Sequence, residues 1–228
     1  MYADPTPANA ARAHAGGAAP FARAPAPPWV VLDEFLAADE RANLLRFATA
    51  RARRFQPSEV LASDAASTVD PASRRSRVLF DLEDFESILR RRVLWSLPYA
   101  IARLGLRPFP ISAVDVQLTV THGGGFFRPH FDDDEHGALD RRLSFVYYFA
   151  REPRRFAGGE LQLFASRAPD TRTTGVRSWR IQPGQNQCVL FESDRLHAVA
   201  PVICRSMDFG DGRFTVNGWI LATRRAWP

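Results

Sequence analysis

Apolar side chains recur at helical spacing in two segments of the first half of the chain. One predicted helix covers residues 38–53, with acidic residues in its first turn, where they suit the positive end of the helix dipole. A second covers residues 85–104, and Pro98 inside it predicts a kink or a split. Short strands are expected at residues 30–32 and near Val60.

From residue 111 onward the pattern changes to short apolar runs that are separated by loops. Five runs are rich in β-branched and aromatic residues, namely VDVQLTV, LSFVYYF, GELQLF, NQCVLF and RFTVNGWIL. Helices first and strands afterwards predict an α+β, mainly β fold. Many short strands at this spacing favour a jelly roll or a related sandwich.

The chain divides into a tail and one predicted domain. Residues 1–28 are rich in Ala and Pro and hold few large apolar side chains. They cannot bury enough surface to offset the entropy lost on ordering, so a disordered tail is expected. Residues 29–228 are long enough to form a single domain. We expect helical support at about 29–110 and the β core at about 111–222.

Composition narrows the class of protein. The apolar fraction of 46% is that of a folded globular protein. The net charge is +5, but all 30 basic residues are arginines and they are scattered, so no specific nucleic-acid partner is expected. The chain contains no apolar run that could span a bilayer, and its start does not have the pattern of a secretory signal. Cys188 and Cys204 make a poor disulfide framework, which favours free thiols in a cytoplasmic protein.

The stretch RPHFDDDEHG at residues 128–137 contains two of the five histidines of the chain. On a strand, His130 and Asp132 would point to the same face, because side chains two residues apart share a face. An imidazole and a carboxylate placed in this way make two adjacent metal ligands. A solvated acidic loop is the alternative for this stretch taken alone, and His136 in the acidic turn is expected at the surface.

His197 is the candidate for a third ligand. It follows the buried-strand pattern CVLFESD and precedes AVAPV, so it falls at a strand start, where a fold can hold it rigidly. Two histidines and one carboxylate on one side of an iron ion leave three positions open. That arrangement is typical of non-haem Fe(II) oxygenases.

Such enzymes commonly reduce O2 with 2-oxoglutarate, a dicarboxylate that needs a cationic partner for its far carboxylate. Arg213 lies on the strand-like run GRFTVNGW after His197, and the planar guanidinium of arginine fits a carboxylate with two parallel hydrogen bonds. Thr215 shares its face and can donate a hydroxyl hydrogen bond to the same carboxylate. A surface role is the alternative for Arg213 taken alone.

These motifs, in this order, resemble the catalytic core of the Fe(II)/2-oxoglutarate oxygenases, in particular the prolyl-4-hydroxylase-like branch. The resemblance covers residues 112–221, about half of the chain. It is carried by PHFD at 129–132, RRLSFVYYF at 141–149, GGELQLF at 158–164, LFESDRLHAVAPV at 190–202 and GRFTVNGW at 212–219.

The resemblance implies a double-stranded β-helix, which is a cupin-like jelly roll, with Fe(II) at its open mouth. It implies that His130, Asp132 and His197 are the iron ligands and that Arg213 anchors 2-oxoglutarate. Thr121 stands where the family often has a tyrosine, which puts one hydrogen bond to cosubstrate or substrate in doubt.

The family usually has a tyrosine on the strand SFVYYF that bonds the far carboxylate of 2-oxoglutarate. The offset from Ser144 selects Tyr148, but strand periodicity alone does not separate it from Tyr147. Leu161 and Val199 would form apolar walls around the cosubstrate.

The activity that this resemblance implies is hydroxylation of an unactivated C–H bond, with O2 as oxidant and succinate and CO2 as co-products. Ascorbate would support it as a reductant. The branch favours a prolyl residue in a protein, free proline or a related amino acid as substrate. Asp132 argues against halogenases, which lack the carboxylate ligand, and Trp219 occupies the position of a second arginine in nucleic-acid demethylases. The alternatives are a hydroxylase of a small metabolite and a non-catalytic metal-binding jelly roll that acts as a sensor.

Arg128 is the candidate for substrate binding. If the strand extends back to it, its side chain leaves on the face of the metal ligands and can receive a substrate carboxylate or peptide carbonyl. The alternative is that Pro129 turns the strand and sends Arg128 into solvent, in which case the loop at residues 56–76 holds the substrate. The three glycines at 123–125 predict a flexible lip beside this position.

Overall fold

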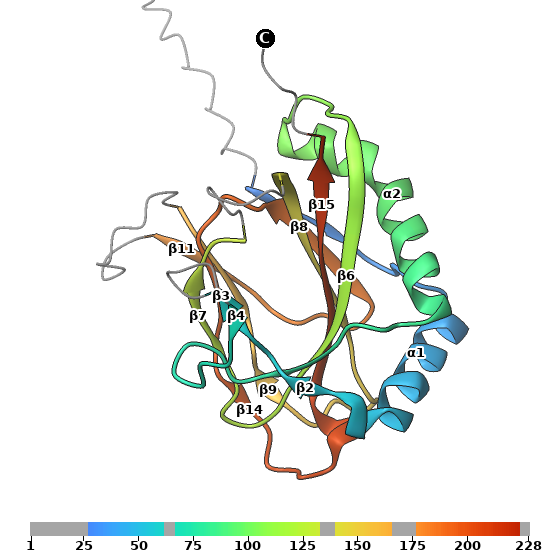
Figure 1. Ribbon diagram of the computed structural model, residues 1–228, viewed down its shortest axis with the longest axis vertical. Helices are drawn as coiled ribbons and strands as arrows, with labels where there is room; N and C mark the ends of the chain where they lie inside the picture. The colour runs from blue at the N-terminus through green and yellow to red at the C-terminus, as the bar shows by residue number, and fades with distance from the viewer. Residues whose placement is uncertain (1–26, 62–66, 133–139, 166–176, 224–228) are drawn as a thin grey trace, which may run out of the picture.

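The structure is a computed structural model, and it describes residues 27–61, 67–132, 140–165 and 177–223 (Figure 1). Apart from Pro27 and Pro28, the predicted tail lies outside the described residues, and so do His136 and the acidic turn around it. Within the described ranges, neither helix combines the length and the apolar character needed to cross a bilayer.

Two α-helices precede most of the strands, in the predicted order. The helices are α1 (Ala38–Ala50) and α2 (Asp84–Leu104), with short 3-10 turns η1 (Ala52–Arg54) and η2 (Phe209–Asp211). The strands are β1 (Trp29–Leu32), β2 (Gln56–Pro57), β3 (Val60–Leu61), β4 (Ser67–Thr68), β5 (Arg77–Leu79), β6 (Ile111–Thr121), β7 (Phe127–His130), β8 (Asp140–Phe149), β9 (Ala157–Gly158), β10 (Leu161–Phe164), β11 (Ser178–Ile181), β12 (Gln187–Glu192), β13 (His197–Val199), β14 (Val202–Ile203) and β15 (Arg213–Ala222).

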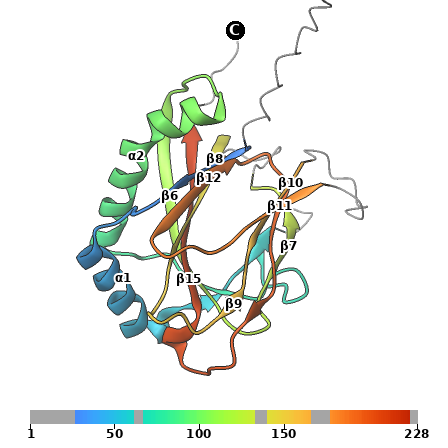
Figure 2. The ribbon, with the colours of Figure 1, turned by 180° about the vertical axis from the view of Figure 1, so that it is seen from behind.

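Two antiparallel sheets face each other and form the β core. The larger sheet has seven strands in the order β1-β12-β8-β15-β6-β5-β2, and the smaller has four in the order β11-β10-β13-β7. In both views the helices lie on one side of the large sheet, and β7, β10 and β11 lie on the other (Figures 1 and 2). The predicted jelly roll with N-terminal supporting helices is confirmed.

The central strand β15 contributes side chains to both faces of the large sheet. Phe214, Val216 and Ile220 are fully buried and belong to the cluster that packs against the helices. Arg213 and Thr215 alternate with them and therefore point to the other face of the sheet, toward the smaller sheet. The alternation thus places an apolar face on the helices and a polar face in the interior of the barrel.

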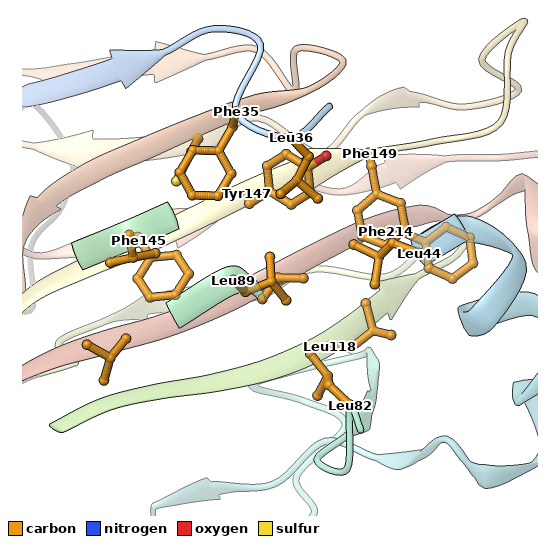
Figure 3. Packing of buried hydrophobic residues seen from close by; sticks show 14 of the residues in the cluster. Phe35, Leu36, Leu44, Leu82, Leu89, Leu118, Phe145, Tyr147, Phe149 and Phe214 are labelled. Carbon is orange, nitrogen blue, oxygen red and sulfur yellow. The ribbon is translucent and has the colours of Figure 1, made fainter. Parts of the chain in front are cut away.

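The apolar faces of both helices cover the outer face of the large sheet. Leu44 of α1 and Leu89 of α2 are fully buried there with Phe145 and Phe149 of β8 (Figure 3). Pro98 neither splits nor ends α2, which is one helix from Asp84 to Leu104, so the predicted split is wrong. Burial of the apolar residues around Pro98 against the sheet outweighs the loss of one backbone hydrogen bond.

The glycine run at residues 123–125 forms a packed turn. A Cβ at Gly123 would lie 2.3 Å from the carbonyl oxygen of Cys204, so only glycine fits this approach. The Gly124 N–H donates to the carbonyl of Val202 at 2.8 Å. The predicted flexible lip is therefore wrong, because the glycines allow close packing of two chain segments.

Candidate functional site

Three polar side chains converge where β7 and β13 pair. His130 and His197 are register partners on these strands, and Asp132 follows β7. The Nε2 atom of His130 lies 3.6 Å from Asp132 Oδ1, and the Nε2 atom of His197 lies 3.3 Å from Asp132 Oδ2. One donor atom from each residue falls within 4.8 Å of the other two, which is close enough for all three to bind one ion.

Main-chain carbonyls fix the orientation of both imidazole rings. The Nδ1 atom of His130 lies 2.8 Å from the carbonyl oxygen of Arg128, and that of His197 lies 2.9 Å from the carbonyl oxygen of Arg195. Because a carbonyl only accepts, each Nδ1 carries the proton and each Nε2 presents its lone pair. Phe127 stacks on His130 with ring centroids 3.5 Å apart, which further restricts that ring.

A chain of hydroxyl groups holds Asp132. The Ser144 hydroxyl donates to Asp132 Oδ2 at 2.7 Å and lies 2.9 Å from the hydroxyl of Ser193. Both serines are buried, and the Asp132 N–H donates to the carbonyl of Ser193. The carboxylate therefore keeps one orientation before any ion binds.

The charge states of the three residues suit a divalent cation. Burial, reinforced by His197, lowers the pKa of His130 to about 3, so its ring is neutral at pH 7. Burial opposes ionisation of Asp132, but His197, His130 and the Ser144 hydroxyl outweigh it and hold the pKa of the carboxyl below its usual value. Burial also disfavours a charged His197, yet Asp132 outweighs it and raises the pKa of that ring. A cation bound at this point would replace the proton on His197 as the partner of Asp132.

Arg213 lies deeper in the interior, at the start of β15. It is 3% exposed, and its Nε donates to the carbonyl of Gly159 at 2.8 Å. Its Nη2, the Thr215 hydroxyl and the Tyr148 hydroxyl are buried and have no hydrogen-bond partner among the described residues. Burial lowers the pKa of Arg213 and raises the pKa of Tyr148 to about 12. Three buried donors without acceptors form a cradle that fits a carboxylate.

The structure separates the two candidate tyrosines. Tyr148 pairs with Thr215 across the large sheet, and the Arg213 guanidinium carbon lies 5.0 Å from the centre of its ring. Tyr147 points to the helix side and donates to Asn186 Oδ1 at 2.9 Å. Only Tyr148 therefore lies with the arginine.

A cavity of about 840 Å³ joins the histidine cluster to the arginine. Leu161 and Val199 line it and are register partners on β10 and β13. Thr121 is buried and also lines the cavity. This volume is that of a pocket for a sizeable ligand, so it has room for a second molecule beside a dicarboxylate.

The structure places Arg128 among the residues that line the cavity. The strand β7 extends back through Pro129, and the Arg128 side chain is exposed at the edge of the cavity. Phe127 stacks on His130, and the pairing of β7 with β13 shifts register between His197 and Val199. That Arg128 binds the substrate stays a prediction.

Sequence reasoning missed Arg74, which lines the cavity beside the histidine cluster. It forms an isolated antiparallel bridge with Phe127, and its guanidinium carbon lies 4.7 Å from the centre of the Phe127 ring. Burial lowers the pKa of Arg74 to about 10, although the nearby Asp132 carboxylate acts in the opposite direction. No local sequence signal distinguishes it from the other arginines.

The sequence matches one protein family. Residues 116–221 match the 2OG-Fe(II) oxygenase superfamily. The chain is also 36% identical over 150 residues to an uncharacterized PKHD-type hydroxylase of Synechocystis sp.. That alignment covers 64% of this chain and 50% of the relative, so the chain spans about half the length of the curated relative it matches.

Solved structures of prolyl hydroxylases have a similar fold. A prolyl-4-hydroxylase of Pseudomonas putida matches with a TM-score of 0.56 and 18% identity, over 86% of this chain and 93% of the other. A prolyl hydroxylase of Trichoplax adhaerens, solved with a hypoxia inducible factor peptide, matches with a TM-score of 0.60 and 17% identity, over 86% and 84%. At these identities the likeness supports the fold alone, and that fold agrees with the family match.

Proposed function

We propose that this protein hydroxylates an unactivated C–H bond with Fe(II), 2-oxoglutarate and O2, because residues 116–221 match the 2OG-Fe(II) oxygenase superfamily. The observation that carries the proposal is one cavity that joins two sites. The first is the cluster of three ligand atoms within 4.8 Å. The second is the cradle of buried donors without acceptors around Arg213.

In this proposal the histidine cluster holds the iron. His130 and His197 would donate through Nε2, whose lone pairs are presented by the main-chain hydrogen bonds at Nδ1. Asp132 would supply a carboxylate oxygen while Ser144 keeps the group in place. A carboxylate at this position supports hydroxylation rather than halogenation.

The second site would hold 2-oxoglutarate. Arg213 would bind its far carboxylate with Thr215 and Tyr148, and Leu161 and Val199 would exclude water around its carbon chain. When bound, Fe(II) and 2-oxoglutarate supply the oxidising chemistry, with succinate and CO2 as co-products. The residues of this chain contribute binding, orientation and a dry interior.

For the substrate we propose a prolyl residue of a protein, free proline or a related amino acid. The support is the likeness to prolyl hydroxylases in fold and the room that the cavity leaves beside a dicarboxylate. A small-metabolite hydroxylase is the alternative within the same chemistry. We further propose that ascorbate restores Fe(II), and that the protein works in the cytoplasm, where Cys188 and Cys204 would stay free thiols.

The test is succinate formation with Fe(II) and 2-oxoglutarate across pools of amino acids and proline-containing peptides. His197→Ala should abolish stoichiometric Mn(II) binding, because one of three ligands is lost. Arg213→Ala should raise the constant for 2-oxoglutarate about tenfold or more with Mn(II) binding intact, because truncating a buried ion pair costs about 2–5 kcal/mol. Arg180→Ala, at an exposed position on β11, is the matched control and should change neither constant.

Each outcome has a distinct meaning. Wild-type Mn(II) affinity in His197→Ala would contradict the metal assignment. An unchanged 2-oxoglutarate constant in Arg213→Ala would show that another arginine binds the cosubstrate. Metal and 2-oxoglutarate binding with no succinate from any pool would favour a non-catalytic sensing module.

A further inference from the structure

Arg74 is a half-buried cation whose side-chain hydrogen bonds to the described residues are made to neutral groups. Its Nε donates to the Ser76 hydroxyl at 2.9 Å, and its Nη1 donates to the Glu59 main-chain carbonyl at 3.3 Å. Across the described ranges, no carboxylate oxygen comes within ion-pair distance of it. Eight other arginines have such a partner there: Arg41, Arg51, Arg54, Arg90, Arg92, Arg142, Arg151 and Arg195. A guanidinium in this position is prepared for an anion that none of the described residues provides.

The charge balance of the loaded site points to the same conclusion. Asp132 is the acid that attracts Arg74, but in the proposed function Asp132 is a ligand of the metal. The two charges of Fe(II) and the charge of Arg213 are matched by Asp132 and dianionic 2-oxoglutarate. Arg74 then stays an unbalanced charge at the cavity, as does Arg141, which donates to the Asp132 main-chain carbonyl at 3.1 Å. A substrate anion would neutralise such a charge.

Geometry limits how far that anion lies from the metal ligands. The Arg74 guanidinium carbon lies 4.7 Å from the centre of the Phe127 ring, whose centre lies 3.5 Å from that of His130. The distance from the guanidinium carbon to the centre of the His130 ring therefore cannot exceed the sum of the two, 8.2 Å. One residue spans about 3.5 Å of extended chain, so an anion bound here belongs to the oxidised residue or to its immediate neighbour.

We infer that Arg74 binds a carboxylate of the substrate, and that the substrate class is therefore a free amino acid or the C-terminal residue of a peptide. This inference rests on the proposed function and selects among its substrates. An internal residue of a protein without an acidic neighbour offers only neutral amide groups at this distance along the main chain. The exposed Arg128 lies at the edge of the cavity, where it has no comparable burial.

Matched acids and amides test the inference directly. The probes are L-proline against L-prolinamide, and a short peptide ending in proline as free acid against its C-terminal amide. Binding is measured by calorimetry on protein loaded with Mn(II) and 2-oxoglutarate, so that no turnover is needed. The acid of each pair should bind at least about thirtyfold more tightly than the amide, which corresponds to the lower end of the range for a buried charge pair.

Two variants assign that preference to one side chain. Arg74→Gln should bind acid and amide equally, with its Mn(II) and 2-oxoglutarate constants unchanged. Arg75→Gln is the matched control, because Arg75 is adjacent, exposed and outside the cavity lining, and it should keep the wild-type preference. Arg74→Lys should recover part of the preference, since it restores the charge without the planar fork.

Equal affinity for acid and amide in the wild type, no binding of either acid probe, or an acid preference that survives in Arg74→Gln would overturn the inference. Turnover of internal prolyl peptides and amides would overturn it as well, while leaving the proposed hydroxylase function standing. Failure to bind Mn(II) and 2-oxoglutarate at all would instead remove the proposed function. The two proposals can therefore fail separately.

Discussion

Ser144 and Ser193 have no role in the chemistry of the site, yet they determine how it is presented. Both are buried, and together they connect β8 and the chain before β13 to the carboxylate of Asp132. Groups that hydrogen-bond a metal ligand from outside fix its orientation and its basicity. The hydroxyl of Ser144 makes the direct contact with Asp132, so its loss should weaken metal binding at the proposed site.

Ser144→Ala should weaken Mn(II) binding about 10–100-fold, which is the usual effect of losing a partner of a metal ligand. Affinity is measured by competition with a chelator. Ser144→Thr is the control, because it retains the hydroxyl and should stay near the wild type. A wild-type Mn(II) constant in Ser144→Ala would show that Asp132 holds its orientation without this bond.

At the scale of elements, Asn186 fixes the segment between β1 and α1 to the start of β12. Its side chain accepts from the Leu36 N–H at 3.0 Å and from the Tyr147 hydroxyl, and it donates to the Leu36 carbonyl at 2.8 Å. Its φ of 58° lies in the left-handed region, which asparagine tolerates better than most residues. One residue therefore joins the N-terminal support to the β core.

Asn186→Ala should lower the free energy of unfolding by about 4–5 kcal/mol, since three hydrogen bonds contribute about 1 kcal/mol each and the left-handed backbone costs alanine about 1–2 kcal/mol. Urea denaturation measures it. Asn186→Gly separates the two causes, because it loses the same hydrogen bonds and adopts this φ without strain. If the two variants were equally stable, backbone strain would have no part in the effect.

The sequence predicted the elements that a repeating pattern specifies. Both helices and all five strand-like runs from residue 111 are present, because apolar periodicity is the direct trace of a buried face. Rare residue types made the site predictable, because the chain has few histidines. The structure brings His130 and His197 together with Asp132. Arg74 and Ser144 could not be found in this way, since their roles arise from contacts with distant segments. Arg128 could be placed at the cavity because the strand extends back through Pro129, and its role stays a prediction.

At the scale of the whole molecule, the described interior holds buried polar groups that have no hydrogen-bond partner among the described residues. The polar face of the large sheet carries donors without acceptors around Arg213, and the cavity joins them to the cluster at Asp132. A ligand that binds only the folded state stabilises it by about 2.7 kcal/mol at a hundred times its dissociation constant. Ligand binding should therefore be visible as a change in global stability.

Mn(II) at that concentration should raise the melting temperature by about 5–10 °C, since 1 kcal/mol shifts a domain of this size by about 2–4 °C. Adding 2-oxoglutarate should raise it further, and more strongly with Mn(II) present than without, because the cosubstrate would bind both the metal and Arg213. Differential scanning fluorimetry measures both shifts. In His197→Ala the Mn(II) shift should vanish, whereas in Arg213→Ala it should persist while the 2-oxoglutarate shift is lost. If each variant lost both the Mn(II) shift and the 2-oxoglutarate shift, the two residues would act on folding. Separate losses are expected only if each variant removes the binding of one ligand and leaves the interior intact.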